Sequence, residues 1–207
     1  MPCPNSDRCP MVRPYGAPEF NPSEAIEGDP ASPIWIVALN PKTKPADHTQ
    51  GRPNPMTWGQ SDLGGAYVPH FGRLKAIVGD EWHRHLLRPN GIAHTDLLKC
   101  GSPAFTQVER QSVEFCRGFL LEQIKKYRPK LLLVLSSDAA RYIETAAQID
   151  PHGTEGLWNI DDTGSPCYVL LSGYSASQQE RYARRRLRRD FLAACTRLGL
   201  HPPDSST

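Results

Sequence analysis

Short apolar runs alternate with longer amphipathic segments along most of this sequence, and this alternation constrains the fold more than any other feature. The apolar runs predict strands at residues 33–39, 91–98, 130–135 and 167–171. The amphipathic segments predict helices at residues 70–87, 107–127, 136–147 and 178–198. Because strands that alternate with helices form a parallel sheet covered on both faces, we predict an α/β fold. It has three layers, α/β/α, around a central, mostly parallel four-stranded sheet.

The two ends of the chain differ from this regular part. Residues 1–32 are rich in proline and lack periodicity, so they form an arm that something other than a core must fix to the domain. Residues 33–200 form a single domain, a size at which one full hydrophobic core can be buried. Residues 201–207 are expected to be a disordered tail. Residues 42–69 are polar and rich in glycine and proline, and a loop of that length in a compact domain usually has a function.

The chain has no apolar run long enough to cross a bilayer, and its first residues are polar. We therefore expect a cytoplasmic protein, a monomer without a membrane partner. In a reducing compartment, six cysteines are thiols or metal ligands rather than disulfides.

Four of the cysteines form two distant pairs. Cys3 and Cys9 lie on the arm, whereas Cys100 follows a predicted strand and Cys116 lies on the next helix. A metal centre that joins the pairs would pin the arm to the domain. Spacing alone leaves two alternatives open, since the four thiols can be unrelated, and zinc also accepts four cysteines. Cys167 and Cys195 lie in apolar patterns and are interpreted as small core residues.

The segment KCGSP at residues 99–103, followed by FCRGFLLEQIKKYRPKLLLVLSSDAARYI at residues 115–143, resembles the iron–sulfur uracil-DNA glycosylases. The resemblance extends from the arm to about residue 175 and implies the fold of the uracil-DNA glycosylase-like superfamily. It also implies a structural 4Fe–4S cluster on Cys3, Cys9, Cys100 and Cys116, with zinc as the alternative. The family's early cysteine pair is usually closer than Cys3 and Cys9. DNA, single- or double-stranded, is the implied partner.

The first predicted strand ends in Ala38-Leu39-Asn40-Pro41, which is similar to the first motif of the superfamily. By this resemblance Asn40 positions the attacking water, while Ala38, Leu39 and Pro41 line the base pocket. The alternative is that Asn40 only turns the chain before Pro41.

Two aromatic residues follow the glycine-rich stretch where the family places the side chain that stacks on the base. Tyr67 and Phe71 are the candidates, and either can equally be a core residue. Phe71 lies on the apolar side of a predicted helix, which favours Tyr67 for stacking.

Asp96 stands four residues before Cys100, where the iron–sulfur family has the asparagine that reads uracil. An ionised carboxylate only accepts hydrogen bonds, so it suits a base edge with N–H donors or acts as a base toward water. It can equally cap the turn after the strand. His94, two residues earlier, is interpreted as a satisfied core histidine.

A second departure follows the fourth strand, where the family has His-Pro-Ser. Gly173 and Tyr174 replace the histidine and proline, and Ser175 matches the serine. A missing charge-stabilising donor costs about a hundredfold or more in rate. Tyr174 can donate its hydroxyl or insert into DNA instead.

The last predicted helix has a basic side. Residues 174–207 contain seven arginines and three acidic residues, against a net charge of +2 for the whole chain. Arg181, Arg184, Arg185 and Arg188 lie opposite the apolar stripe and are candidates for DNA phosphate contacts. A solvated helix face is the alternative.

These residues leave two functions open. The first is a DNA glycosylase that hydrolyses the N-glycosidic bond of a flipped damaged or deaminated base, uracil or another, with Asn40, Asp96 and Ser175 as catalytic residues. The second is a catalytically inactive iron–sulfur protein that binds nucleic acid on the same fold. A third interpretation, an α/β nucleotide-binding or hydrolytic domain, has little support, because the sequence lacks a glycine-rich phosphate loop.

Overall fold

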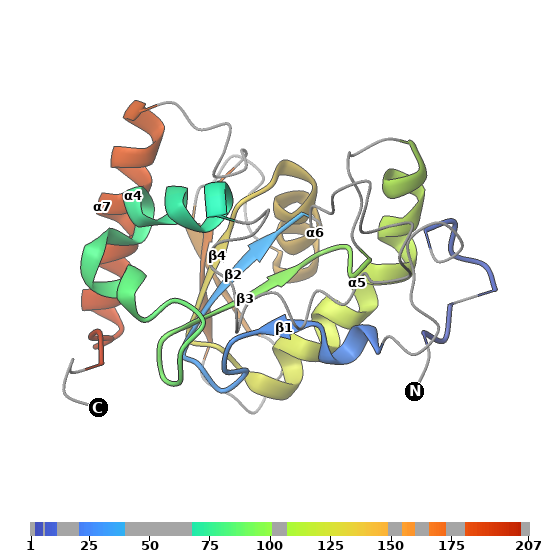
Figure 1. Cartoon of the computed structure of the whole chain (residues 1–207), viewed down its shortest axis with the longest axis horizontal. Helices are drawn as coiled ribbons and strands as arrows, with labels where there is room; N and C mark the ends of the chain where they lie inside the picture. The colour runs from blue at the N-terminus through green and yellow to red at the C-terminus, as the bar shows by residue number, and fades with distance from the viewer. Residues whose placement is uncertain are drawn as a thin grey trace.

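The computed structural model describes residues 3–5, 7–11, 21–39, 68–100, 107–148, 155–159, 166–172 and 181–203, with only the backbone at residues 68–70, 108, 109, 181 and 182. These residues form three layers, with a sheet between two pairs of helices (Figure 1). The helices α4 (Val68–Arg84) and α7 (Arg181–Arg197) cover one face of the sheet. The helices α5 (Gln107–Tyr127) and α6 (Ser137–Ala147) cover the other.

The sheet has six strands in the order β1-β3-β2-β4-β6-β5. Its centre is the predicted parallel set of β2 (Ile34–Ala38), β3 (Ile92–Asp96), β4 (Leu131–Val134) and β6 (Cys167–Leu171). Two short antiparallel strands form the edges, β1 (Ile26–Glu27) beside β3 and β5 (Glu155–Trp158) beside β6. The predicted α/β fold is confirmed, and the edge strands are additions: β1 lies in the segment interpreted as an arm, and β5 lies between the third predicted helix and the fourth predicted strand.

The central strands are buried on both faces. All five residues of β2 are buried, with Ile34 and Ile36 toward α4 and α7, and Trp35 and Val37 toward α5 and α6. This two-sided burial explains why the parallel strands are continuous apolar runs. Among the described residues, no helix is long and apolar enough to span a membrane.

The helices begin and end close to their predicted positions. Ser136 caps α6, its side chain accepting the Ala139 N–H at 3.0 Å. α4 is broken at Gly79, where φ is +85°. A Cβ atom at this glycine would lie 3.3 Å from Nη2 of Arg188, so α7 packs closely on the break. A short 3₁₀ helix, η1 (Pro22–Glu24), precedes β1.

The parallel strands point in the same direction, so their carboxyl ends meet at one edge (Figure 1). Ala38, the last residue of β2, pairs with Asp96, the last residue of β3. Beyond them, the N–H groups of Leu97 and Leu98 donate to the carbonyls of Ala38 and Leu39, both at 2.9 Å. Ligands of parallel α/β sheets bind at this edge.

The packing of the segment before β3 on the end of α4 can be tested at Gly91, because a Cβ atom there would lie 1.9 Å from the carbonyl oxygen of His85. We expect Gly91→Ala to lower the free energy of unfolding by about 2 kcal/mol or more, since backbone must move. Gly72→Ala is the matched control, because Gly72 is exposed in α4 with no atom within 4 Å of the added carbon. Urea denaturation compares the two variants, and equal stabilities would show that the backbone around Gly91 is not closely packed.

Candidate functional site

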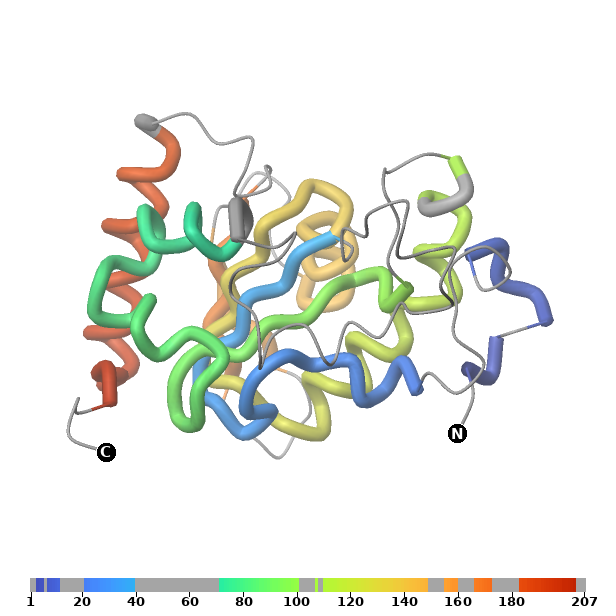
Figure 2. The backbone as a smooth tube through the Cα atoms, viewed as in Figure 1, coloured from blue at the N-terminus to red at the C-terminus, as the bar shows by residue number. Residues whose placement is uncertain are grey.

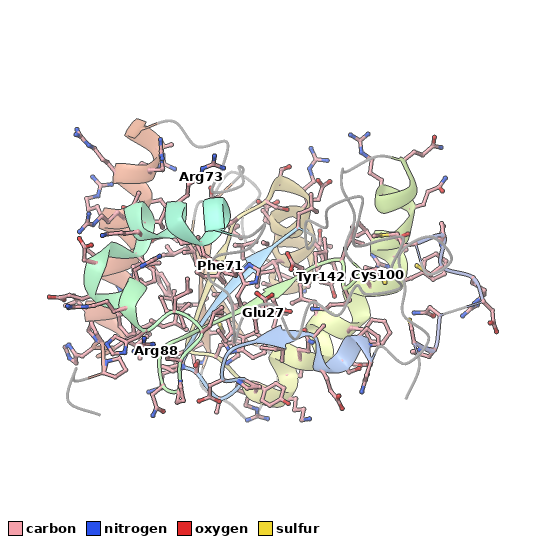
Figure 3. All side chains as sticks on the ribbon, viewed as in Figure 1. Glu27, Phe71, Arg73, Arg88, Cys100 and Tyr142 are labelled. Carbon is pink, nitrogen blue, oxygen red and sulfur yellow. The ribbon has the colours of Figure 1, made fainter. Side chains whose placement is uncertain are left out.

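Four thiols from distant parts of the chain converge beside the N-terminal half of α5. Cys9, Cys100 and Cys116 are buried in one apolar cluster with Met11, Ala25 and Leu98. Cys3 is half-buried, and its charge would interact with those of the other three. Figure 3 shows Cys100 beside α5. The convergence is a finding of the structure, whereas the role of these cysteines as metal ligands stays a prediction.

The arm is held beside α5 by hydrogen bonds as well as by the thiol cluster (Figure 2). The Asn5 side chain donates to the Phe115 carbonyl at 3.0 Å, one residue before Cys116. The carbonyl of Asn5 accepts from the N–H groups of Arg8 and Cys9 at 3.1 and 2.8 Å, which forms a tight turn. The arm therefore has a defined local structure where its cysteines meet the domain.

The pocket favours the neutral thiols of Cys100 and Cys116. Burial, together with repulsion from the neighbouring cysteines, raises the pKa of Cys100. Burial raises the pKa of Cys116 to about 11, although the Lys99 backbone N–H acts against this. Four cysteines in an apolar pocket are a donor set that a metal centre would deprotonate. Among the described residues, no group of three or more His, Cys, Asp or Glu side chains has the geometry to hold a metal ion.

A buried lysine lies between the cysteine pocket and the end of β3. The Lys99 ammonium, in a residue that is 1% exposed, donates to Thr95 Oγ1 and to Gln123 Oε1, both at 2.7 Å. Burial lowers the pKa of Lys99 to about 7, while Asp96 and Cys116 favour the charged form.

The same network attaches the segment around η1. The Gln123 amide donates to the carbonyls of Ser23 and Pro22 at 3.0 and 3.2 Å, and Thr95 Oγ1 donates to the Ala25 carbonyl at 2.7 Å. Neutral side chains thus bridge β3, α5 and the backbone before β1.

Asp96 is buried at the carboxyl edge of the sheet. It is 7% exposed and pairs in the sheet with Ala38. Burial raises the pKa of Asp96 to about 6 and Glu27 adds to this, while His94 and Lys99 act in the opposite direction. Both the neutral and the ionised carboxyl are therefore accessible near neutral pH.

A buried ion pair lies next to Asp96. His94 Nδ1 is 2.9 Å from Glu27 Oε2, and the two side chains are 1% and 7% exposed. The interpretation of His94 as a core histidine holds, but its partner was missed. Glu27 belongs to the arm, where no periodic pattern exists, and only the pairing of β1 with β3 brings it opposite His94.

The predicted base-pocket residues are only partly described. Ala38 is buried and Leu39 is half-buried at the end of β2. Phe71 is buried in the core, with its ring centroid 5.3 Å from that of His94 in an edge-to-face contact. This position agrees with the alternative of Phe71 as a core residue. The positions outside the described residues are Asn40, Pro41, Tyr67, Tyr174 and Ser175.

The arginines of α7 have different surroundings. Arg185 is exposed and Arg184 is half-buried, while the side chain of Arg181 is outside the described part. Arg188 packs on Gly79. The pKa of Asp80 is lowered mainly by Lys75, and the charge of Arg188 adds to this. At least one arginine of this helix therefore contributes to the contact between α4 and α7, and DNA binding by the others stays a prediction.

A groove of about 420 Å³ lies between α5 and α6, and no pattern in the sequence indicated it. Arg110, Arg117 and Arg141 line it together with acidic residues, and Arg117 Nη2 is 2.8 Å from Glu114 Oε2. The guanidinium carbon of Arg117 lies 6.0 Å from the centroid of the Tyr142 ring. The mixture of charges gives this groove no clear preference for anions.

Two comparisons with known proteins bear on this arrangement. Residues 25–198 match the family model described as the uracil DNA glycosylase superfamily. The matched region begins just before β1 and ends after α7, so it includes the whole sheet and both pairs of helices. A search of curated proteins found no match.

The buried network around Gln123 generates a stability prediction. Gln123→Ala should lower the free energy of unfolding by about 2–4 kcal/mol, because it removes one of the two hydrogen-bond acceptors of the buried Lys99 ammonium and the amide that donates to the Ser23 and Pro22 carbonyls. Gln111→Ala, at an exposed position of the same helix, should change it by less than about 0.5 kcal/mol. Chemical denaturation measures both, and a loss at Gln123 no larger than at Gln111 would show that the network is unimportant.

Proposed function

Because the chain belongs to the uracil-DNA glycosylase superfamily, we propose that it is a DNA glycosylase that hydrolyses the N-glycosidic bond of a flipped damaged or deaminated base. One structural observation supports the proposal in addition to membership of the superfamily. A buried carboxyl group, Asp96, stands at the carboxyl edge of the sheet beside Ala38, the first residue of the first motif. A buried polar group of this kind is typical of a ligand-reading side chain.

In the proposed site, the first motif supplies the water. Leu39 accepts the Leu98 N–H at 2.9 Å, so the chain enters Asn40 from a position held against the residues after Asp96. Asn40 would orient the attacking water toward the sugar, whose transition state resembles an oxocarbenium ion and needs no strong base. Ala38, Leu39 and Pro41 would line the pocket.

Asp96 would read the edge of the flipped base. Its ionised form only accepts hydrogen bonds, whereas its neutral form has one O–H donor and a carbonyl acceptor, as an amide has a donor and an acceptor. The neutral form can therefore replace the asparagine expected for uracil. Tyr67 would stack on the base, since Phe71 is buried in the core, and Ser175 would assist the departure of the base.

The rate of uracil release should follow the fraction of Asp96 carboxyl groups that are neutral, and should therefore depend on pH. With a pKa of about 6, the group is about 90% neutral at pH 5 and about 3% neutral at pH 7.5. We expect release of uracil from an oligonucleotide to be about 30-fold faster at pH 5 than at pH 7.5.

Asp96→Asn separates this effect from general pH effects. The variant should release uracil at pH 7.5 at least as fast as the parent does at pH 5, with a nearly flat profile. Asn40→Ala is the control for background hydrolysis. If a panel of uracil, hypoxanthine and other lesions, in single and double strands, yields no release by the parent or the Asp96→Asn variant, the glycosylase proposal is wrong.

We also propose a 4Fe–4S cluster on Cys3, Cys9, Cys100 and Cys116. Its support is the convergence of Cys9, Cys100 and Cys116 in an apolar pocket with Cys3 close enough to interact electrostatically, and the resemblance of the segments around Cys100 and Cys116 to the iron–sulfur family. The cluster would cross-link the arm to α5 and the end of β3 and would take no part in the reaction. Zinc is the alternative metal.

Protein prepared without oxygen should be brown, absorb near 400 nm and contain about four irons per chain. Cys100→Ser should lose most of the iron. Cys195→Ser is the matched control, because Cys195 is equally buried but lies in the core under α7. Colourless protein with one zinc per chain, or equal iron loss in both variants, would refute the cluster.

A second candidate function is nucleic-acid binding without catalysis. The observation that favours it is the replacement of the family's His-Pro by Gly173 and Tyr174. DNA binding that weakens steeply with salt, and weakens further when Arg184 and Arg185 are changed to glutamine, would indicate this function if no lesion is released.

A further inference from the structure

The buried ion pair of Glu27 and His94 lies on the same sheet face as Asp96. Side chains alternate along a strand, so His94 and Asp96 project to the same face of β3, about 7 Å apart along the strand. Glu27 reaches His94 from β1, with 2.9 Å between Oε2 and Nδ1. Figure 3 shows Glu27 and Phe71 near the middle of the molecule, coming from β1 and α4 on either side of β3.

The surroundings of the pair make a purely stabilising role a poor explanation. Ile36 is the residue opposite His94 on β2, and Phe71 covers the imidazole from α4. In such an apolar layer, removing two charges from water is costly, and hydrophobic residues of similar volume are often as stable. The pair therefore calls for a role that two apolar side chains cannot fulfil.

The effect of these charges on the protonation of Asp96 is such a role. The titratable groups that face His94 and Asp96 in the described residues are Glu27 from β1 and Lys99 from the end of β3, while α4 contributes the uncharged Phe71 ring. Burial alone would lower the pKa of His94, but the hydrogen bond to Glu27 and the charges of Asp96 and Glu27 outweigh it and raise the pKa. A protonated His94 in turn favours the ionised form of Asp96.

We propose that His94, held as an imidazolium by Glu27, is a positioning residue that keeps Asp96 ionised at neutral pH and so directs the site toward a base edge with N–H donors. This proposal rests on the glycosylase function and names its substrate class. Hypoxanthine has one carbonyl beside its N1–H and fits an ionised Asp96 better than uracil, which has a carbonyl on each side of its N3–H. His94 itself does not contact the base.

A titration of the whole protein by NMR, without DNA, tests the coupling directly. In the parent protein, the Asp96 carboxyl should titrate near pH 6 and the His94 ring should stay protonated throughout that transition. His94→Gln removes the positive neighbour and should raise the Asp96 midpoint by about one pH unit. His85→Gln is the matched control, because His85 is not among the groups that face Asp96, and it should leave the midpoint unchanged.

The substrate preference provides the second readout. At pH 7.5, His94→Gln should raise the ratio of uracil release to hypoxanthine release about fivefold to tenfold, whereas His85→Gln should not. An unchanged Asp96 midpoint in a folded His94→Gln variant would overturn the proposal. If that variant does not fold, the parent decides, since a His94 ring that is neutral at pH 6 overturns it as well. Absence of any base release, with the coupling present, would refute the glycosylase function but not the electrostatic link.

Discussion

The docking of residues 3–5, 7–11 and 21–27 against β3 and α5 is the constraint on which the candidate site depends. The Asn5 side chain donates to the backbone of α5, and the thiols of the arm lie near those of the domain. The Gln123 amide donates to the backbone carbonyl of Ser23 in η1. Together these contacts place β1 at the edge of the sheet. Without them, the pairing that brings Glu27 to His94 would have to be maintained by two residues of strand, which is too short to persist alone.

The same contacts form a continuous path from the cysteine pocket to the edge where a base would bind. Lys99 is adjacent to Cys100 in sequence, bonds to Thr95 on β3, and interacts electrostatically with Asp96. His94 and Asp96 then share one face of β3. The superfamily fold thus combines here with a buried set of charges in which the state of one group depends on its neighbours. This interdependence links the N-terminal segment to Asp96, the residue proposed to read the base.

Much of the fold was predictable from the sequence, because long uninterrupted patterns determine it. β6 and α5 begin and end where the apolar runs and helical spacing predicted. α4 ends earlier than predicted and is broken at Gly79. The break was not predicted, because the contact of Gly79 with Arg188 of α7 is a tertiary contact that no local sequence pattern records. The edge strands β1 and β5 are too short for a periodic signal. For the same reason Glu27 could not be paired with His94, whereas the grouping of the four cysteines was suggested by the family resemblance.

Hydrogen exchange at the backbone N–H of Cys9 tests the central claim, that the converging cysteines fasten the leading segment to the sheet. This N–H donates to the Asn5 carbonyl at 2.8 Å and lies in the cysteine pocket. We predict strong protection in metal-loaded protein and rapid exchange after the metal is removed, while Leu133 in the core of β4 stays protected. Equal protection of Cys9 with and without metal would contradict the claim.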